Sequence, residues 1–212
     1  MNDAWKGIPQ MTAYRPHRFN TAVRSFLIPL ILLCLLCGCS AGSVSEVPEY
    51  SISYTEADMS GYRNMEGKAH MFREITFETL IDLFRHQESA VVWISRTNCP
   101  YCQNGVWILN DAAEDAGIPV YYINADSPMS RNGTMEENQR LYEELCGYIQ
   151  EALRMDDSGT LSMYVPLLMN IQSGILINYH VSLTDSFSLS DSDTLSEKET
   201  EELYSIYRSV LE

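Results

Sequence analysis

Apolar residues along the stretch 69–212 follow spacings that predict alternating strands and helices. Continuous β-branched and aromatic runs at 89–95 and 118–126 are typical of strands buried on both faces. The stretch 69–75 predicts a shorter strand before them. Residues 163–183 form two further apolar runs around a tight QSG turn, which indicates a β-hairpin.

Apolar positions three or four residues apart predict helices at 76–86, 100–117, 135–155 and 196–212. Start and stop signals support these helices: Thr76 as an N-cap, Gly117 as a stop, and a Ser196 to Glu199 capping box. Residues 156–162 are expected to be a loop.

The predicted element order is therefore β-α-β-α-β-α-β-β-α, which indicates an α/β domain with a central mixed sheet flanked by helices. A length of 212 residues allows one ordinary domain with an appendage. The third helix, at 135–155, belongs to a helical insertion before the hairpin.

The first 38 residues have the layout of a secretory signal peptide. Four basic residues and one acidic residue precede or flank an apolar run at 26–38, and this run of 13 residues is shorter than the ~20 needed to span a bilayer. Met11 is an alternative translation start to Met1.

The end of the apolar run, LCGC, resembles the bacterial lipoprotein box. Leu36 and Gly38 fit its pattern, and the resemblance implies that Cys39 is acylated and becomes the new N-terminus, anchored to the lipid bilayer. The alternative is an ordinary secreted protein cleaved near Ala41, in which Cys39 is a spare thiol.

Residues 39–68 mix Ser, Gly, Glu and Tyr without sustained periodicity, so we expect a flexible tether, with its tyrosines able to add a local contact or a short edge strand. The domain proper is then 69–212. The chain carries 14 Lys plus Arg against 29 Asp plus Glu, and removal of residues 1–38 leaves 10 against 28, a net charge of −18. This balance argues against nucleic acid as a partner.

Two cysteines lie where the second predicted strand meets the second helix, in the sequence CPYC. Unpaired backbone N–H groups and the helix dipole at a helix N-terminus stabilise the thiolate of Cys99. Pro100 suits the first helical position, where its missing N–H is not needed. Cys102 is about one turn further along, so its sulfur can reach Cys99 and resolve a mixed disulfide.

Other interpretations of the pair remain open. A zinc site needs four ligands, and beyond this pair the domain offers Cys146 and three scattered histidines with no second ligand pair, so no metal is expected. A purely structural disulfide is a second alternative, although two-residue disulfide loops are strained and reducible. Cys146 itself is either a buried small hydrophobe or a third redox thiol.

The sequence WISRTNCPYCQ, with its preceding strand and following helix, resembles the thioredoxin superfamily. Its CPYC matches the glutaredoxin type and also resembles thioredoxin-like proteins of Gram-positive bacteria known as bacteriocin-transport accessory proteins. The YVP at 164–166 matches a second family landmark, a cis-proline facing the active site. The resemblance covers 69–212 and implies a thioredoxin-like fold.

The resemblance implies roles for six residues of this chain: Cys99 and Cys102 as the catalytic pair, Pro100 and Tyr101 as residues that tune it, and Val165 and Pro166 as the substrate-binding strand. A cis Pro166 would turn the backbone of Val165 toward the cysteines, where an extended peptide can add as a strand. An ordinary trans edge-strand proline is the alternative. Tyr101 is expected to be the exposed aromatic at the site, with Trp93 and Trp107 in the core.

The chain departs from thioredoxin at two positions. Trp93 replaces a buried aspartate and Asn98 replaces a tryptophan, so that carboxylate is not available to take a proton from Cys102. The segment from Ala125 to Met163 is longer than a minimal thioredoxin needs, and we expect it to form a lid or a docking face.

The sequence thus predicts a membrane-anchored, extracytoplasmic thiol–disulfide oxidoreductase without a bound cofactor. Its partners would be protein thiols or disulfides and a redox partner protein. The alternative is a non-catalytic accessory or binding module that assists an exporter or a secreted peptide. The direction of electron flow is not determined at this level, because it depends on a small difference in stability between the two redox forms.

Overall fold

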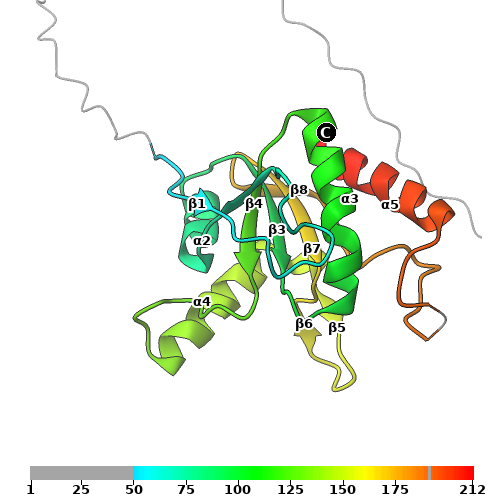
Figure 1. The fold of residues 1–212 in the computed structure, drawn as a ribbon. Coiled ribbons are helices and arrows are strands. Elements are labelled where there is room, and N and C mark those ends of the chain that lie inside the picture. The colour runs from blue at the N-terminus through cyan, green and yellow to red at the C-terminus, as the bar shows by residue number, and fades with distance from the viewer. Residues whose placement is uncertain (1–49, 191) are drawn as a thin grey trace, which may run out of the picture. The chain divides into compact units, whose positions relative to one another are not determined.

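The computed structural model describes residues 50–190 and 192–212, which form a six-stranded mixed sheet with helices on both faces (Figure 1). The predicted signal peptide and Cys39 lie outside these residues. The strand order is β1 (Thr55–Glu56), β2 (Phe72–Glu74), β4 (Val120–Asn124), β3 (Ala90–Ser95), β7 (Leu167–Gln172) and β8 (Ile175–Val181). Strands β2, β4 and β3 are parallel, whereas β1, β7 and β8 pair antiparallel with their neighbours.

Strand β3 lies in the middle of the sheet and sends alternate side chains to opposite faces, as the period of a strand requires. Val91 and Trp93 pack with helices α3 (Pro100–Ala116) and α5 (Glu197–Leu211). Val92 and Ile94 pack with α2 (Phe77–Arg85) and α4 (Met135–Tyr148). Figure 1 shows α3 and α5 on one side of the sheet and α2 on the other. The continuous apolar run therefore reflects burial on both faces, as predicted.

The predicted helix signals are confirmed. The Thr76 side chain accepts a hydrogen bond from the backbone N–H of Thr79 at 3.1 Å, Gly117 ends α3 in the left-handed conformation, and Ser196 and Glu199 form the capping box. The turn between β7 and β8 has φ of 49° at Ser173 and 71° at Gly174. Two successive positive φ values match the twist of a two-residue hairpin.

The prediction of one helix over 135–155 followed by a loop is wrong at its end. Helix α4 ends at Tyr148, a 3₁₀ turn η2 covers Gln150–Ala152, and two short strands, β5 (Arg154–Met155) and β6 (Leu161–Ser162), form a separate hairpin. Ile149 and Ala152 remain buried through the 3₁₀ turn, so the apolar spacing continues although the α-helix does not. The Asp156 carboxylate accepts hydrogen bonds from the N–H groups of Ser158 and Thr160, which closes the hairpin loop.

The prediction that the tether extends to residue 68 is also wrong for its second half. Residues 57–65, which we call the N-terminal strap, bury four side chains in the core beside α3: Ala57, Met59, Tyr62 and Met65. Successive turns join Met59 to Tyr62 and Tyr62 to Met65. The expected edge strand is present as β1. Among the described residues, no helix is both long and apolar enough to cross a bilayer.

Candidate active site

The CPYC motif lies at the start of α3, directly after the turn that follows β3. Cys99 is the N-cap of this helix, and its Sγ accepts a hydrogen bond from the Cys102 N–H at 3.3 Å. Pro100 occupies the first helical position, as predicted. Both cysteines are free thiols; Cys99 is half-buried and Cys102 is fully buried. An accessible sulfur therefore lies in front of a protected one.

The two sulfurs differ sharply in acidity. The pKa of Cys99 falls to about 6, and the largest cause is a hydrogen bond that the Cys102 S–H donates to the Cys99 thiolate. Backbone N–H groups of Cys102 and Tyr101 and the positive charge of Arg96 stabilise this thiolate further, whereas burial opposes the shift. The same sulfur–sulfur hydrogen bond, together with burial, raises the pKa of Cys102. At neutral pH the accessible sulfur is thus mainly thiolate and the buried one is thiol.

The predicted proline segment lies opposite the cysteines. The Val165–Pro166 peptide bond is cis, so the expected cis-proline is present. The Cys99 Sγ lies 3.9 Å from the Val165 carbonyl oxygen, within hydrogen-bonding distance for sulfur. Tyr101 is half-buried and packs edge-on against Phe187, with ring centroids 5.7 Å apart. The structure therefore brings all six predicted site residues of the domain to one place.

The strand order, the cysteine pair at the start of α3 and the cis-proline at the entrance to β7 together decide the fold class. The fold is thioredoxin-like. A search of solved structures finds thioredoxin from Aeropyrum pernix, with 18% sequence identity, a TM-score of 0.33, and coverage of 52% of this chain and 74% of that chain. No protein-family model matches the chain, and neither does any curated protein.

Two surface grooves of this thioredoxin-like domain meet at Tyr164 and Val165. One groove, the Cys99 groove, is also lined by Arg96, Asn98, Cys99, Asp156, Ser162 and Met163. The other, the Tyr101 groove, is also lined by Tyr101, Arg154, Met155, Phe187 and residues 181–185. Tyr164 is 42% exposed. The expectation that Tyr101 alone would present an aromatic ring at the site is therefore wrong.

The expected lid or docking face is only partly located at the cysteines. Helix α4 packs on α2, where Phe84 stacks on Tyr148 and the guanidinium of Arg85 makes two hydrogen bonds to Glu144. The β5–β6 hairpin instead borders both grooves through Met155 and its neighbours. The part of the insertion beside the site is thus the hairpin that the sequence pattern did not predict.

The sequence pattern did not predict three polar residues near the cysteines: Ser95, Tyr62 and Gln103. Ser95, at the end of β3, is fully buried and bonds to the Tyr62 hydroxyl at 2.8 Å. Gln103 links α3 to the strap through the Gly61 carbonyl and the Arg63 N–H. The spacing of Met59, Tyr62 and Met65 was a usable signal for a packed strap, whereas nothing in the sequence marks Gln103.

Cys146 is half-buried on α4, and burial raises its pKa, which favours the thiol. This fits its interpretation as a small hydrophobe and gives it no link to Cys99. Among residues 50–190 and 192–212, His, Cys, Asp and Glu side chains form no group of three that could hold a metal ion.

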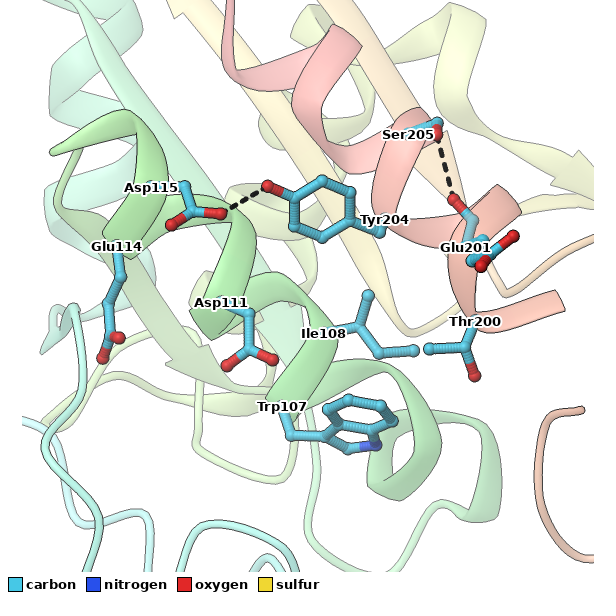
Figure 2. Close-up of a pocket in the computed structure, with 9 residues that line it drawn as sticks. All are labelled: Trp107, Ile108, Asp111, Glu114, Asp115, Thr200, Glu201, Tyr204 and Ser205. Atoms are coloured by element: carbon cyan, nitrogen blue, oxygen red, sulfur yellow. Dashed lines mark hydrogen bonds between the residues drawn. The ribbon is translucent and has the colours of Figure 1, made fainter. Parts of the chain in front are cut away.

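A further groove lies between α3 and α5, two turns beyond the cysteines along α3 (Figure 2). Its wall carries four carboxylates, Asp111, Glu114, Asp115 and Glu201, and the Tyr204 hydroxyl donates a hydrogen bond to Asp115 at 2.6 Å. Trp107 packs against the core but is only half-buried and also lines this groove, so its assignment to the core is only partly correct.

Proposed function

We propose that this protein is a thiol–disulfide oxidoreductase in which Cys99 is the nucleophile and Cys102 is the resolving thiol. The observation that carries the proposal is the asymmetry of the pair: an accessible Cys99 sulfur with its pKa lowered to about 6, backed by a buried Cys102 thiol. A structural disulfide would gain nothing from an acidic, accessible sulfur.

The reaction proceeds in two exchanges. The Cys99 thiolate attacks a substrate disulfide, one substrate sulfur leaves as a thiolate, and a Cys99–substrate mixed disulfide forms. Cys102 then loses its proton and attacks the Cys99 sulfur, which forms the Cys99–Cys102 disulfide and releases the second substrate thiolate. The protein dithiol is oxidised by two electrons and the substrate disulfide is reduced. The reverse sequence transfers a disulfide to a substrate.

Val165 and Pro166 are the proposed docking strand. The Val165 carbonyl lies beside the Cys99 sulfur, so an extended substrate segment bonded to this backbone would place its own sulfur near the nucleophile. Backbone pairing of this kind depends little on the substrate's sequence. The exposed Tyr164 ring and the apolar Met155 of the Tyr101 groove support contact with unfolded protein substrates.

The proposed location is the extracytoplasmic face of a membrane, with Cys39 as the lipid anchor. Support for it comes from the signal-like residues 1–38 and the lipoprotein-box pattern at Leu36, Gly38 and Cys39. The CPYC sequence supports similarity to the thioredoxin-like accessory proteins of Gram-positive bacteria. We propose protein thiols and a redox partner protein as the reaction partners, with no bound cofactor.

The test is the equilibrium reduction potential of the Cys99–Cys102 pair in the full chain. Trypsin releases residues 97–131, which contain these two cysteines and no others, so alkylation and mass spectrometry report this pair alone. A potential of about −270 mV would indicate a reductant, and one of about −120 mV an oxidant.

Absence of a reversible couple would contradict the enzymatic proposal and favour the non-catalytic accessory module. Replacing both cysteines by Ser separates the two functions in the cell. An oxidoreductase loses its phenotype with that double change, whereas an accessory module that acts through its fold keeps it.

A further inference from the structure

A row of buried hydroxyl groups lies behind the resolving cysteine. Hydrogen bonding from the buried Ser95 hydroxyl lowers the pKa of Cys102, which places this hydroxyl beside the sulfur. It also bonds to the Tyr62 hydroxyl at 2.8 Å, and Tyr62 in turn lies 3.3 Å from the Tyr122 hydroxyl. All four side chains are at most 3% exposed. Because buried hydroxyl groups are usually hydrogen-bonded, the Tyr122, Tyr62 and Ser95 hydroxyls form a hydrogen-bonded row next to Cys102.

The N-terminal strap holds Tyr62 in this row. The Gln103 side chain donates to the Gly61 carbonyl at 2.9 Å and accepts from the Arg63 N–H at 3.0 Å, so both neighbours of Tyr62 are fixed to α3. A Cβ at Gly61 would lie 2.6 Å from Thr97 Cγ2, which shows how closely the strap approaches the cysteine loop. The strap is therefore built to place Tyr62 beneath the site.

The second exchange needs a group that stabilises negative charge on Cys102. This sulfur is fully buried, and burial disfavours its thiolate. Besides Cys99, the Ser95 hydroxyl and the Arg96 backbone N–H are the groups whose hydrogen bonding affects the pKa of Cys102; both lower it, and neither is a carboxylate. Trp93, where thioredoxin has its buried aspartate, points into the core instead.

We propose that Ser95 is a catalytic residue of the resolving step, donating a hydrogen bond to the Cys102 sulfur as it loses its proton, and that Tyr62 is the positioning residue that orients Ser95. This inference rests on the proposed function. In the mixed disulfide the Cys99 sulfur is bonded to substrate and no longer accepts from the Cys102 S–H. The Cys102 proton passes to solvent, its thiolate attacks Cys99, and the substrate thiolate departs, so charge and electrons balance.

Several titratable groups face Cys102 and set the background for its ionisation. Cys99 lies on its own helix, Tyr62 on the strap, Tyr122 on β4 and Tyr207 on α5. Burial raises the pKa of each of the three tyrosines above its ordinary value, so they are neutral at neutral pH. A change in the rate of the resolving step near neutral pH therefore does not come from ionisation of a neighbouring phenol.

The experiment follows the full chain, reduced, after mixing with dithio-bis-nitrobenzoate. Attack by Cys99 releases one coloured thiolate at a rate that depends on reagent concentration. Attack by Cys102 on the resulting mixed disulfide releases the second at a rate independent of reagent, and a Cys102→Ser chain identifies this phase by losing it. The pH dependence of the second phase gives the ionisation midpoint of Cys102.

Ser95→Ala should slow the second phase about tenfold at neutral pH and move its midpoint upward by about one pH unit, because one hydrogen bond to the thiolate is lost. Tyr62→Phe should slow it about threefold, since Ser95 then loses its orienting partner. Tyr204→Phe is the matched control: it removes a hydroxyl that is hydrogen-bonded to Asp115 and lies outside this row, and it should leave the rate within about twofold. The first phase should be unchanged in all three variants.

An unchanged second phase in Ser95→Ala and Tyr62→Phe would overturn the inference. So would an equal loss in both phases, which would indicate a general distortion of the site. If the unmodified chain shows no reagent-independent phase at all, the proposed function fails and the inference with it. A slowed second phase with an upward-shifted midpoint supports both.

Discussion

Replacing Cys102 by Ala should raise the pKa of Cys99, because the change removes the S–H donor that contributes most to lowering it. The pKa of Cys99 falls from 9.0 to about 6 in the intact chain. A hydrogen bond to a charged group is worth ~1.5–3 kcal/mol, and sulfur is a weak donor, so the lower end applies. This corresponds to a rise of about one pH unit, since one unit equals ~1.4 kcal/mol.

The assay is the rate of Cys99 alkylation by iodoacetamide as a function of pH, measured on the fully reduced chain. The tryptic peptide 97–131 contains both Cys99 and Cys102, so its fragment-ion spectrum is used to assign the label to Cys99. The unmodified chain should show a midpoint at the Cys99 pKa of about 6. At that pH the Cys102→Ala chain should react about fivefold more slowly, because its thiolate fraction falls from about one half to about one tenth.

Cys146→Ala is the matched control, since it removes a different thiol, which is half-buried on α4 and away from the pair. Its alkylation profile at Cys99 should equal that of the unmodified chain. A Cys102→Ala midpoint that stays near that of the intact chain would refute the reasoning. The acidity of Cys99 would then come from the backbone N–H groups at the start of α3 and from the Arg96 charge.

Three further predictions concern stability and can be checked by denaturant unfolding. Tyr207→Phe should leave the free energy of unfolding unchanged or raise it by up to ~1 kcal/mol, because the Tyr207 hydroxyl is buried without a partner among the described residues; a clear loss would contradict this. Gln103→Ala should lower the free energy of unfolding by ~1–3 kcal/mol. It should also speed hydrogen exchange at the Arg63 amide, because it removes the oxygen that accepts from this N–H. An unchanged exchange rate would show that contacts other than Gln103 hold the strap on α3. Gly174→Ala should lower the free energy of unfolding by ~1–3 kcal/mol, because φ is +71° and a Cβ would lie 2.7 Å from the Phe84 carbonyl oxygen. Gly147→Ala is the control: the space around Gly147 is open, so this change should stabilise α4 by up to ~1 kcal/mol. Equal effects of the two changes would contradict the steric argument.

Much of the fold could be predicted because its signals are local. The apolar run of β3, the caps at Thr76 and Ser196, and the left-handed stop at Gly117 each depend on residues within a few positions of one another. The same holds for the cysteines: Cys99 and Cys102 are neighbours on one helical turn, so their spacing alone indicates that the two sulfurs can meet.

The errors fall where long-range contacts decide the structure. The strap contains polar residues in the pattern of a tether, yet Tyr62 is fully buried because α3 and β3 provide a site for its ring and a partner for its hydroxyl. Helix α4 ends at Tyr148 although the apolar spacing continues, since a 3₁₀ turn keeps Ile149 and Ala152 in the same core.

The sequence by itself determined the order of elements, the helix boundaries marked by caps, and the position of the reactive pair at a helix start, because these follow from backbone preferences over short distances. Only the tertiary structure decided what surrounds that pair: the Val165 carbonyl 3.9 Å from Cys99, the hairpin beside the grooves, and Ser95 and Tyr62 behind Cys102. The Val165 carbonyl is 66 positions from Cys99 along the chain, and packing in the folded domain is what brings these groups together.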